Sequence, residues 1–393
     1  MLPIAWRYCA AVALDADGTL LTSQHVVCPQ AAVQLQRLQH YAPSASSAAH
    51  HNAAGRCVEP ARNSAQQHST PDPIQPVQQR DVLSAAAAIA TQHHTAQHAF
   101  ALVSAAGSRG VLRIIATGRN LRSVVSVLPK YTPIDFVVAG SGGVCVRWPS
   151  QEEVFAHSMR DATAVRLCRH LVASQECHFF ALRCPPMNHV SCAYHCPDLP
   201  DDALATLDFA KRCRVFADLA AVTSIATAED LELEVAAHGG GAGSIQGVFG
   251  GFFAMGSDAA LTRLTEALMV AFGPDELRMV RTTSPTDSRV TWLEMLPSQV
   301  SKALAVARLA EMHGIPSTAV VAVGNDYNDL DMLESAAAGL LVANAPEPLR
   351  RGGRFIVLKR TNDEGGVAEA LVRFFPKCKN IELSSIANSA KAL

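Results

Sequence analysis

Short runs of apolar residues recur along the chain, and each ends in a polar or glycine-rich turn. These runs cover residues 8–14, 111–116, 136–139 and 318–323. Continuous apolar runs of this length are typical of strands that are buried on both faces, as in a parallel sheet. Helical patterns lie between or after them, at residues 121–128 and 301–313. The repeated order of strand, polar turn and helix predicts an α/β fold, a Rossmann-like core with a parallel sheet.

The pattern between residues 147 and 289 differs from the rest of the chain. Strand-like segments are shorter there, and helical patterns occupy residues 160–174 and 258–272. Ser257 is a candidate N-cap for the second of these helices. We interpret residues 147–289 as an α+β cap domain inserted into the core. The core then consists of residues 1–146 and 290–393.

Two segments of the core carry little apolar material. Residues 41–80 are rich in Ala, Ser, Gln, His and Pro and contain few large apolar side chains. Such a composition has too little to bury, so we expect a disordered, low-complexity surface insertion. Residues 377–393 are expected to form a peripheral tail.

Composition and charge narrow the class of protein. Of the 393 residues, 49% are hydrophobic and 17% are charged, which excludes a fully disordered chain. The formal net charge of −2 provides no basic excess for a phosphate backbone, so we expect no nucleic-acid partner. No run of roughly eighteen apolar residues is present, and the N-terminus lacks a basic segment, so neither a membrane span nor a signal peptide is predicted. The eleven cysteines, an odd number, are then expected to be mostly reduced in a cytoplasmic protein.

Polar residues follow several of the predicted strands directly. They are Asp15, Asp17, Thr117, Ser141 and the cluster at residues 324–329. The carboxyl ends of parallel strands meet at one edge of a sheet, so these side chains are expected to gather in one crevice. For each residue taken alone, a helix N-cap or a turn former is the favoured interpretation. Four strand ends together favour a site.

Asp15 and Asp17 place two carboxylates two residues apart beyond the first strand. Carboxylates so close repel one another unless a cation lies between them or one is protonated. A hard divalent ion with oxygen ligands, such as Mg²⁺, meets this need. One carboxylate can then act as a nucleophile and the other as an acid/base.

Four motifs, in order along the chain, resemble those of the haloacid dehalogenase (HAD) superfamily. They are LDADGTLL at residues 14–21, Thr117-Gly118-Arg119, Lys302, and VGNDYNDLDML at residues 323–333. WLEMLP, VANAP and NDEGGVAEAL further resemble the Cof-type subgroup, which contains sugar-phosphate phosphatases with a large cap. The resemblance covers residues 8–40, 81–146 and 290–376, and the cap matches in position and size more than in sequence.

The resemblance implies a role for each motif residue. Asp15 corresponds to the nucleophile that forms an aspartyl-phosphate, and Asp17 to the acid/base. Thr117, through its hydroxyl and a backbone N–H, and Gly118 of the same motif would contact the phosphoryl oxygens, with Lys302 and Asn328 as further phosphate ligands. Lys302 would follow Ser301 as N-cap, at a helix N-terminus that favours anions. The Mg²⁺ ligands would be Asp15, Asp17, Asn325 and Asp329.

Two positions depart from the family pattern. Asn325 stands where the family usually has a metal-binding aspartate, and its amide oxygen can bind Mg²⁺ without contributing a formal charge. Ser141 lies in a Gly-Ser-Gly-Gly turn that replaces the usual Asn-Gly pair, and it can either contact substrate or cap the turn. In the cap, Cys184, His189, Cys192, His195 and Cys196 are dense, but their spacing is not that of a standard zinc site, so ordinary packing is favoured.

These features together predict an enzyme, a phosphoric monoester hydrolase. We expect Mg²⁺-dependent hydrolysis of a small phosphorylated metabolite, most plausibly a sugar phosphate, through an aspartyl-phosphate. One alternative is a phosphomutase or phosphotransferase that uses the same chemistry. Another is a non-catalytic binding or regulatory protein on this fold, which Asn325 motivates. The sequence does not define the substrate or the oligomeric state.

Overall fold

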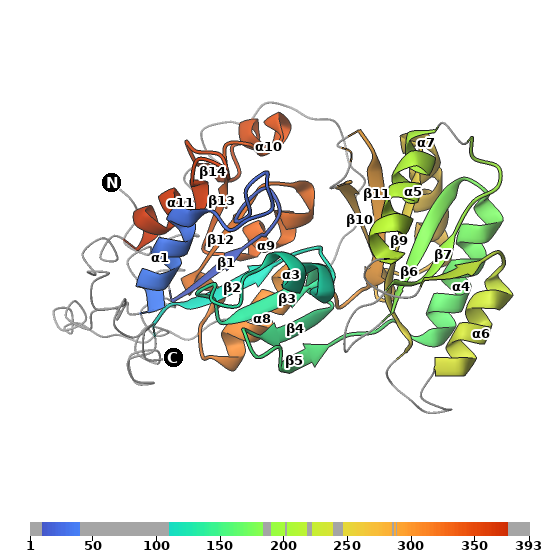
Figure 1. Cartoon of the computed structure of the whole chain (residues 1–393), viewed down its shortest axis with the longest axis horizontal. Coiled ribbons are helices and arrows are strands. Elements are labelled where there is room, and N and C mark those ends of the chain that lie inside the picture. The colour runs from blue at the N-terminus through green and yellow to red at the C-terminus, as the bar shows by residue number, and fades with distance from the viewer. Residues whose placement is uncertain are drawn as a thin grey trace, which may run out of the picture.

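The computed structural model describes residues 10–39, 110–183, 190–200, 203–217, 222–238, 247–284, 287 and 289–375. Two lobes lie side by side, the core at the left of Figure 1 and the cap at the right. Each lobe is built on its own sheet. The predicted fold class, a parallel α/β core with an inserted α+β cap, is confirmed. The proposed insertion at 41–80 and the tail at 377–393 lie outside the described residues.

The core sheet has eight strands among the described residues, in the order β14-β13-β12-β1-β2-β3-β4-β5. The six strands from β14 to β3 pair in parallel, and β4 and β5 add antiparallel pairs at one edge. Their bounds are β1 Ala11–Leu14, β2 Leu112–Ala116, β3 Phe136–Ala139, β4 Val144–Arg147, β5 Glu153–Ala156, β12 Val320–Gly324, β13 Ala338–Leu341 and β14 Ile356–Val357. The four apolar runs of the sequence thus become four adjacent central strands.

Helices cover both faces of the core sheet. Successive residues of β1 show why, because Val12 and Leu14 pack into one apolar layer and Ala11 and Ala13 into the other. Helices α1, α3 and α11 contribute to the first layer, and α8 and α9 to the second. The core helices are α1 Pro29–Gln39, α3 Leu121–Val127, α8 Lys302–Met312, α9 Leu330–Ser335, α10 Glu347–Arg351 and α11 Gly366–Phe374, with short 3-10 turns η3 Gly140–Gly142, η4 Ser317–Ala319 and η5 Tyr327–Asp329.

The cap sheet has six described strands in the order β10-β11-β9-β6-β7-β8, antiparallel except for the last pair. Helices α4, α6 and α7 pack on one face, and α5 packs on the other over Phe180, Phe253 and Trp292. The elements are α4 Asp161–Ser174, β6 Cys177–Arg183, β7 Val190–Tyr194, α5 Leu204–Ala217, β8 Thr223–Ile225, α6 Ala228–His238, β9 Phe249–Gly256, α7 Asp258–Ala271, β10 Leu277–Thr283 and β11 Thr291–Pro297.

The strand pairings move both predicted domain boundaries. Strand β5 lies beyond residue 147 but pairs with β4 of the core sheet, and β11 lies beyond residue 289 but pairs with β9 and β10 of the cap. The sequence-based boundaries at 146/147 and 289/290 are therefore each displaced by about one strand. Both corrections have one cause, since pairing partners rather than local composition decide which sheet a short strand joins.

Local capping signals were predicted correctly. Ser301 and Ser257 are the N-caps of α8 and α7, and their hydroxyls accept hydrogen bonds from Leu304 N and Ala260 N. Gly314, after α8, has the positive φ of 68° that ends helices. No helix of the described segments is long and apolar enough to span a bilayer.

Candidate active site

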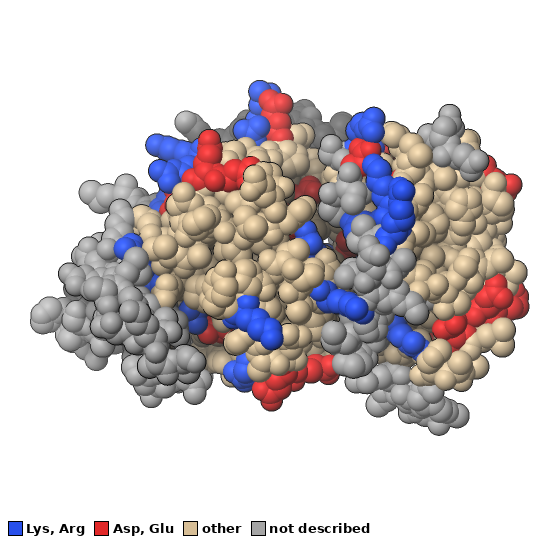
Figure 2. All heavy atoms as spheres, in the orientation of Figure 1, with Lys and Arg blue, Asp and Glu red and all other residues tan. Residues whose placement is uncertain are grey.

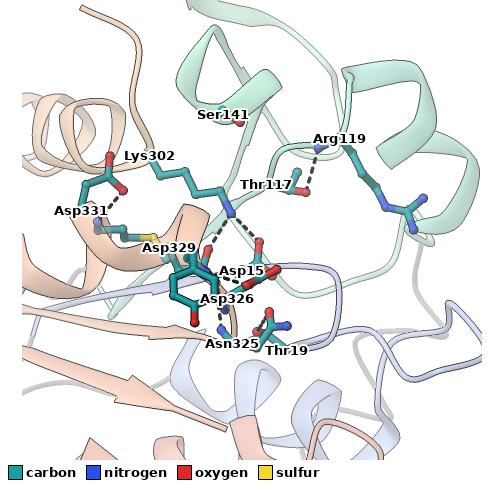
Figure 3. Close-up of polar contacts among 12 residues, drawn as sticks. Asp15, Thr19, Thr117, Arg119, Ser141, Lys302, Asn325, Asp326, Asp329 and Asp331 are labelled. Atoms are coloured by element: carbon teal, nitrogen blue, oxygen red, sulfur yellow. Dashed lines mark hydrogen bonds and ion pairs between the residues drawn. The ribbon is translucent and has the colours of Figure 1, made fainter. Parts of the chain in front are cut away.

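A buried lysine lies between two carboxylates at the carboxyl edge of the core sheet. Lys302 Nζ donates to Asp15 Oδ1 at 2.7 Å and to Asp329 Oδ1 at 2.6 Å (Figure 3). All three side chains are at most 6% exposed. The chain thus brings together residues from β1, the start of α8 and η5, although Asp15 and Lys302 lie 287 positions apart.

Close packing against two glycines fixes the positions of Asp329 and of the start of α8. A Cβ on Gly324, at the end of β12, would lie 2.6 Å from Asp329 Oδ2, so only glycine leaves room for that carboxylate. Asp329 Oδ2 accepts hydrogen bonds from the N–H groups of Asn325 and Asp326. On the opposite side, a Cβ on Gly142 would lie 2.3 Å from Ser301 O, so the η3 turn packs directly on the start of α8. Lys302 is therefore held between two rigid loops.

The buried cluster contains two carboxyl groups and one amino group, so its acidic groups outnumber its basic ones. Burial and the neighbouring carboxylate of Asp329 raise the pKa of Asp15 to about 8, although Lys302 lowers it. Burial opposes the charge of Lys302, but Asp15 and Asp329 outweigh it and raise the pKa of that lysine. With all three groups ionised, one excess negative charge remains, and burial makes such a charge costly. A cation beside Asp15 would offset it.

Four oxygen atoms lie close together where such a cation would bind, and three of them, Asn325 Oδ1, Asp15 Oδ2 and the main-chain oxygen of Asp17, are its candidate ligands. Asn325 Oδ1 lies 2.8 Å from the main-chain oxygen of Asp17, 3.2 Å from Asp15 Oδ2 and 3.0 Å from Thr19 Oγ1. Oxygens bound to Mg²⁺ at about 2.05 Å in octahedral geometry are separated by about 2.9 Å. The donor set therefore fits Mg²⁺. Without a cation, rotation of the Asn325 amide by 180° lets its NH₂ group donate instead to Asp15 Oδ2, the main-chain oxygen of Asp17 and Thr19 Oγ1.

Asp329 and the side chain of Asp17, both predicted as metal ligands, are placed differently. Each Asp329 oxygen already accepts hydrogen bonds, Oδ1 from Lys302 and Oδ2 from main-chain N–H groups. Asp329 thus anchors Lys302 and the main chain at residues 325 and 326. Asp17 turns its carboxylate to Arg119, whose Nε and Nη2 donate to Oδ2 and Oδ1 at 2.6 and 2.5 Å. Only the main-chain oxygen of Asp17 faces the candidate metal position.

In the loop after β2, one of the donors that were predicted to contact phosphate is already paired within the protein. The Thr117 N–H donates to Val138 O within the sheet, so it is not available to a phosphate group. The Gly118 N–H makes no hydrogen bond within the described residues. A ligand could therefore accept hydrogen bonds from the Gly118 N–H and the Thr117 hydroxyl. Asn328 directs its Nδ2 atom towards Gly118 and so faces the same loop.

Two residues near this loop received no individual role in the sequence interpretation. Arg119 belongs to the Thr-Gly-Arg motif and pairs with Asp17. Glu294 belongs to the WLEMLP segment and accepts a 2.7 Å hydrogen bond from Ser141 Oγ. Burial is the main cause that raises the pKa of Glu294. The motif letters could have indicated both residues, but their partners depend on how loops and domains dock.

The cap cysteines and histidines fall into two groups. Cys184 and His189 lie outside the described residues. Cys192 and Cys196 are buried free thiols, and His195 is exposed and packs against the ring of His178. In the described part of the chain, no three His, Cys, Asp or Glu side chains are placed to hold a metal ion. The candidate magnesium ligands described above are not such a cluster, because two of the three oxygens, the Asp17 main-chain oxygen and Asn325 Oδ1, belong to amide groups.

Along the seam between core and cap, lysine and arginine side chains gather on the face shown in Figure 2. One cap residue reaches particularly near the site. Arg212 of α5 lies over the ring of Trp292 at 4.6 Å, and its pKa is lowered to about 10 by burial, with the charges of Asp208, Arg119 and Asp17 as smaller influences. The cap thus adds positive charge close to Asp17.

Comparison with known sequences gives partial matches. Residues 271–371 match the sequence model of the haloacid dehalogenase-like hydrolase family. The chain is 33% identical over 94 residues to the 5-amino-6-(5-phospho-D-ribitylamino)uracil phosphatase YwtE and 38% identical over 78 residues to the phosphatase YwpJ, both from Bacillus subtilis. These matches cover 24% and 20% of this chain but only 32% and 27% of those relatives.

Solved structures match over nearly the full chain. A HAD-superfamily phosphatase from Bacteroides thetaiotaomicron superposes with a TM-score of 0.57 at 15% identity, covering 95% of this chain and 98% of that one. A sugar phosphatase of HAD subclass IIB superposes with a TM-score of 0.55 at 13% identity, covering 93% and 98%. At these identities the likeness shows the fold, including the arrangement of core and cap.

Proposed function

We propose that the chain is a member of the haloacid dehalogenase superfamily and a Mg²⁺-dependent phosphatase that acts on a small phosphomonoester of the sugar phosphate class. One observation carries the proposal: Lys302 is buried between Asp15 and Asp329, beside three oxygens at magnesium-like spacing. Phosphoryl transfer is catalysed mainly by positioning and charge neutralisation, and this cluster provides both. The curated relatives named as phosphatases support the same reaction class.

We assign the attacking atom to Asp15 Oδ1. Lys302 orients this oxygen, whereas Oδ2 faces the candidate metal position. Oδ1 forms a bond to phosphorus as the ester P–O bond breaks, which gives an aspartyl-phosphate and an alkoxide. The Gly118 N–H, the Thr117 hydroxyl, Asn328 and Lys302 hold the phosphoryl oxygens. Bound Mg²⁺, held by Asp15 Oδ2, the Asp17 main-chain oxygen and Asn325 Oδ1, would supply charge neutralisation.

Asp17 moves the protons in this scheme. It gives a proton to the leaving alkoxide and then takes one from the water that attacks the aspartyl-phosphate, which releases phosphate and restores Asp15. In the structure its carboxylate is paired with Arg119. Proton transfer to substrate therefore requires the carboxylate to leave that pair.

The test is phosphate release from a panel of sugar phosphates and from p-nitrophenyl phosphate, with Mg²⁺ or with a chelator. We expect turnover that needs Mg²⁺ and that falls at least about 10³-fold in Asp15→Asn, because the nucleophile is lost. Asp331→Asn is the matched control, since Asp331 pairs with Arg278 and contacts none of the proposed reacting groups. Its activity should stay within about threefold of wild type.

Two outcomes would redirect the assignment. Alcohol acceptors that raise the release of the leaving group above the release of phosphate would indicate a phosphotransferase. Phosphate esters that bind without turnover in the wild-type protein would refute the enzyme proposal and indicate a binding or regulatory role.

A further inference from the structure

Three polar side chains surround the side of Gly118, in the loop after β2, on which a Cβ would project, and this place is called the hollow below. A Cβ atom placed on Gly118 would have as its nearest neighbours Ser141 Oγ at 3.5 Å, Asn328 Nδ2 at 3.6 Å and Glu294 Oε1 at 3.6 Å. Substrate atoms that approach Gly118 from this side would therefore meet these three side chains first. All three nearest atoms are polar, and a hydroxyl satisfies them better than a hydrocarbon group does.

Glu294 is fixed with one carboxylate oxygen directed at this hollow. Its Oε2 accepts the 2.7 Å hydrogen bond from Ser141 Oγ, which leaves Oε1 on the side of Gly118. Ser141 is itself held, because its N–H donates to Thr117 O at 2.9 Å and its φ of 54° lies in the left-handed region. The η3 turn and the loop after β2 therefore present Ser141 and Gly118 as one rigid unit.

The carboxylate comes from the other domain. Glu294 projects from β11 of the cap sheet, whereas Gly118, Ser141 and Asn328 belong to the core. Glu294 keeps partial solvent exposure, as do Gly118 and Asn328. These residues thus lie at the boundary between the two domains and stay partly accessible to solvent.

The chemistry of the hollow selects its occupant. A phosphoryl oxygen there would meet the carboxylate of Glu294, and two anionic oxygens repel one another. A hydroxyl can instead donate to Glu294 Oε1 and accept from Asn328 Nδ2. Because the Gly118 N–H is a proposed phosphate ligand, a group in the hollow is attached close to the phosphoester.

We propose that Glu294, held by Ser141, determines specificity by binding a hydroxyl that lies one or two carbons from the phosphoester of the substrate. The substrate class is then a polyol or sugar phosphate, and aryl phosphates or simple alkyl phosphates leave the hollow unused. This inference rests on the phosphatase activity proposed above. It assigns Glu294 to the binding of the alcohol part and not to the reacting atoms.

The experiment uses two esters that differ by one hydroxyl, 2-hydroxypropyl phosphate and propyl phosphate, with the full chain and Mg²⁺. We expect wild-type kcat/KM to favour the hydroxylated ester by at least about tenfold, the usual worth of a hydrogen bond to a charged group. Glu294→Gln keeps the shape but removes the charge, and should reduce this preference to below about threefold. Ser141→Ala, which releases the carboxylate, should reduce it partly. Activity on p-nitrophenyl phosphate should change less than about threefold in both variants.

Asp331→Asn is the matched control, because it removes another polar link between cap and core, the 2.9 Å pair with Arg278. It should leave the preference for the hydroxylated ester intact. An equal loss of kcat/KM on all three esters in Glu294→Gln would show that Glu294 only docks the cap, and it would overturn the subsite. A reduced preference for the hydroxylated ester in Asp331→Asn would have the same meaning. An unchanged preference in Glu294→Gln would also overturn the subsite. A wild-type protein that hydrolyses none of the three esters would instead refute the phosphatase proposal itself, and the subsite with it.

Discussion

Replacing Asn325 by aspartate tests the candidate metal position without relying on activity. In the metal-free protein the new carboxylate oxygen would lie 3.2 Å from Asp15 Oδ2 and 2.8 Å from the main-chain oxygen of Asp17. Two unit charges 3.2 Å apart repel by about 5 kcal/mol at an effective dielectric constant of about 20. The substitution also removes the amide N–H groups that the rotated Asn325 donates to these oxygens. Protonation of one of the two carboxylates relieves part of this repulsion. We therefore expect the free energy of unfolding of Asn325→Asp in chelator to be about 2–3 kcal/mol lower than that of wild type.

Added Mg²⁺ should cancel most or all of this difference in stability between the two proteins. Wild type gains RT ln(1 + [Mg²⁺]/Kd), which is about 1.4 kcal/mol at 10 mM for a Kd of about 1 mM. Binding to an extra carboxylate should tighten Kd about 100-fold and bring the gain in Asn325→Asp to about 4 kcal/mol. At about 2–4 °C per kcal/mol, the Mg²⁺-induced rise in Tm should be about 5–10 °C larger in the variant.

Differential scanning calorimetry with chelator and with a Mg²⁺ series measures both shifts. Asp326→Asn is the control, because Asp326 is the adjacent carboxyl but bonds Tyr327 N and does not join the three oxygens. Its Mg²⁺-induced shift should match that of wild type within about 1 °C. Equal Mg²⁺-induced shifts in wild type and Asn325→Asp would place the cation elsewhere and refute the reasoning.

Two further predictions concern a pairing in the site and a buried histidine in the cap. Arg119→Gln frees the Asp17 carboxylate from the pair that it has to leave before it transfers a proton, so kcat for alkyl phosphates should rise about threefold relative to kcat for p-nitrophenyl phosphate, whose leaving group needs no proton; an equal change in kcat for both kinds of ester would contradict this requirement. His178 is fully buried and its Nδ1 accepts from Cys196 N, and burial lowers the pKa of His178 to about 4 from 6.5. A depressed pKa stabilises the folded state above about pH 6.5, and this contribution, about 2–3 kcal/mol, is lost as the pH falls towards 4. Urea unfolding should therefore show the stability gap between wild type and His178→Asn narrowing from pH 7.5 to pH 4.5, and a constant gap would refute the assignment.

The parts of the fold that follow from local pattern were predictable from the sequence. The run at 136–139 coincides with β3, and Ser301 caps α8 as expected. The approach of Asp15 to Asp329, which both accept from Lys302 Nζ, was also predictable, because both residues follow parallel strands whose carboxyl ends share one edge of the sheet, whereas Lys302 was expected there only from the family resemblance. Distance along the chain is no obstacle when topology determines the meeting point.

The parts that depend on pairing partners or on side-chain rotation were not predictable. The sequence EVFA at 153–156 has no strong apolar face, and it becomes a core strand only because the free edge of β4 accepts it. Asp17 lies in its predicted place, yet its carboxylate turns to Arg119 and its main-chain oxygen faces Asn325. Glu294 reaches Ser141 only once the cap docks on the core.

A charge count explains how Asn325 is compatible with catalysis. Asp15, Asp329 and Lys302 together carry −1, and a divalent cation raises the site to +1 before a phosphate dianion arrives. An aspartate at position 325 would lower that value to 0. In the proposed site, the asparagine would therefore hold the metal less tightly than an aspartate but leave a net charge that attracts the substrate more strongly. It follows that with saturating Mg²⁺ the Asn325→Asp protein should bind inorganic phosphate about tenfold more weakly than wild type, as titration calorimetry can measure. Tighter phosphate binding by the variant would show that metal affinity, and not net charge, controls substrate binding at this site.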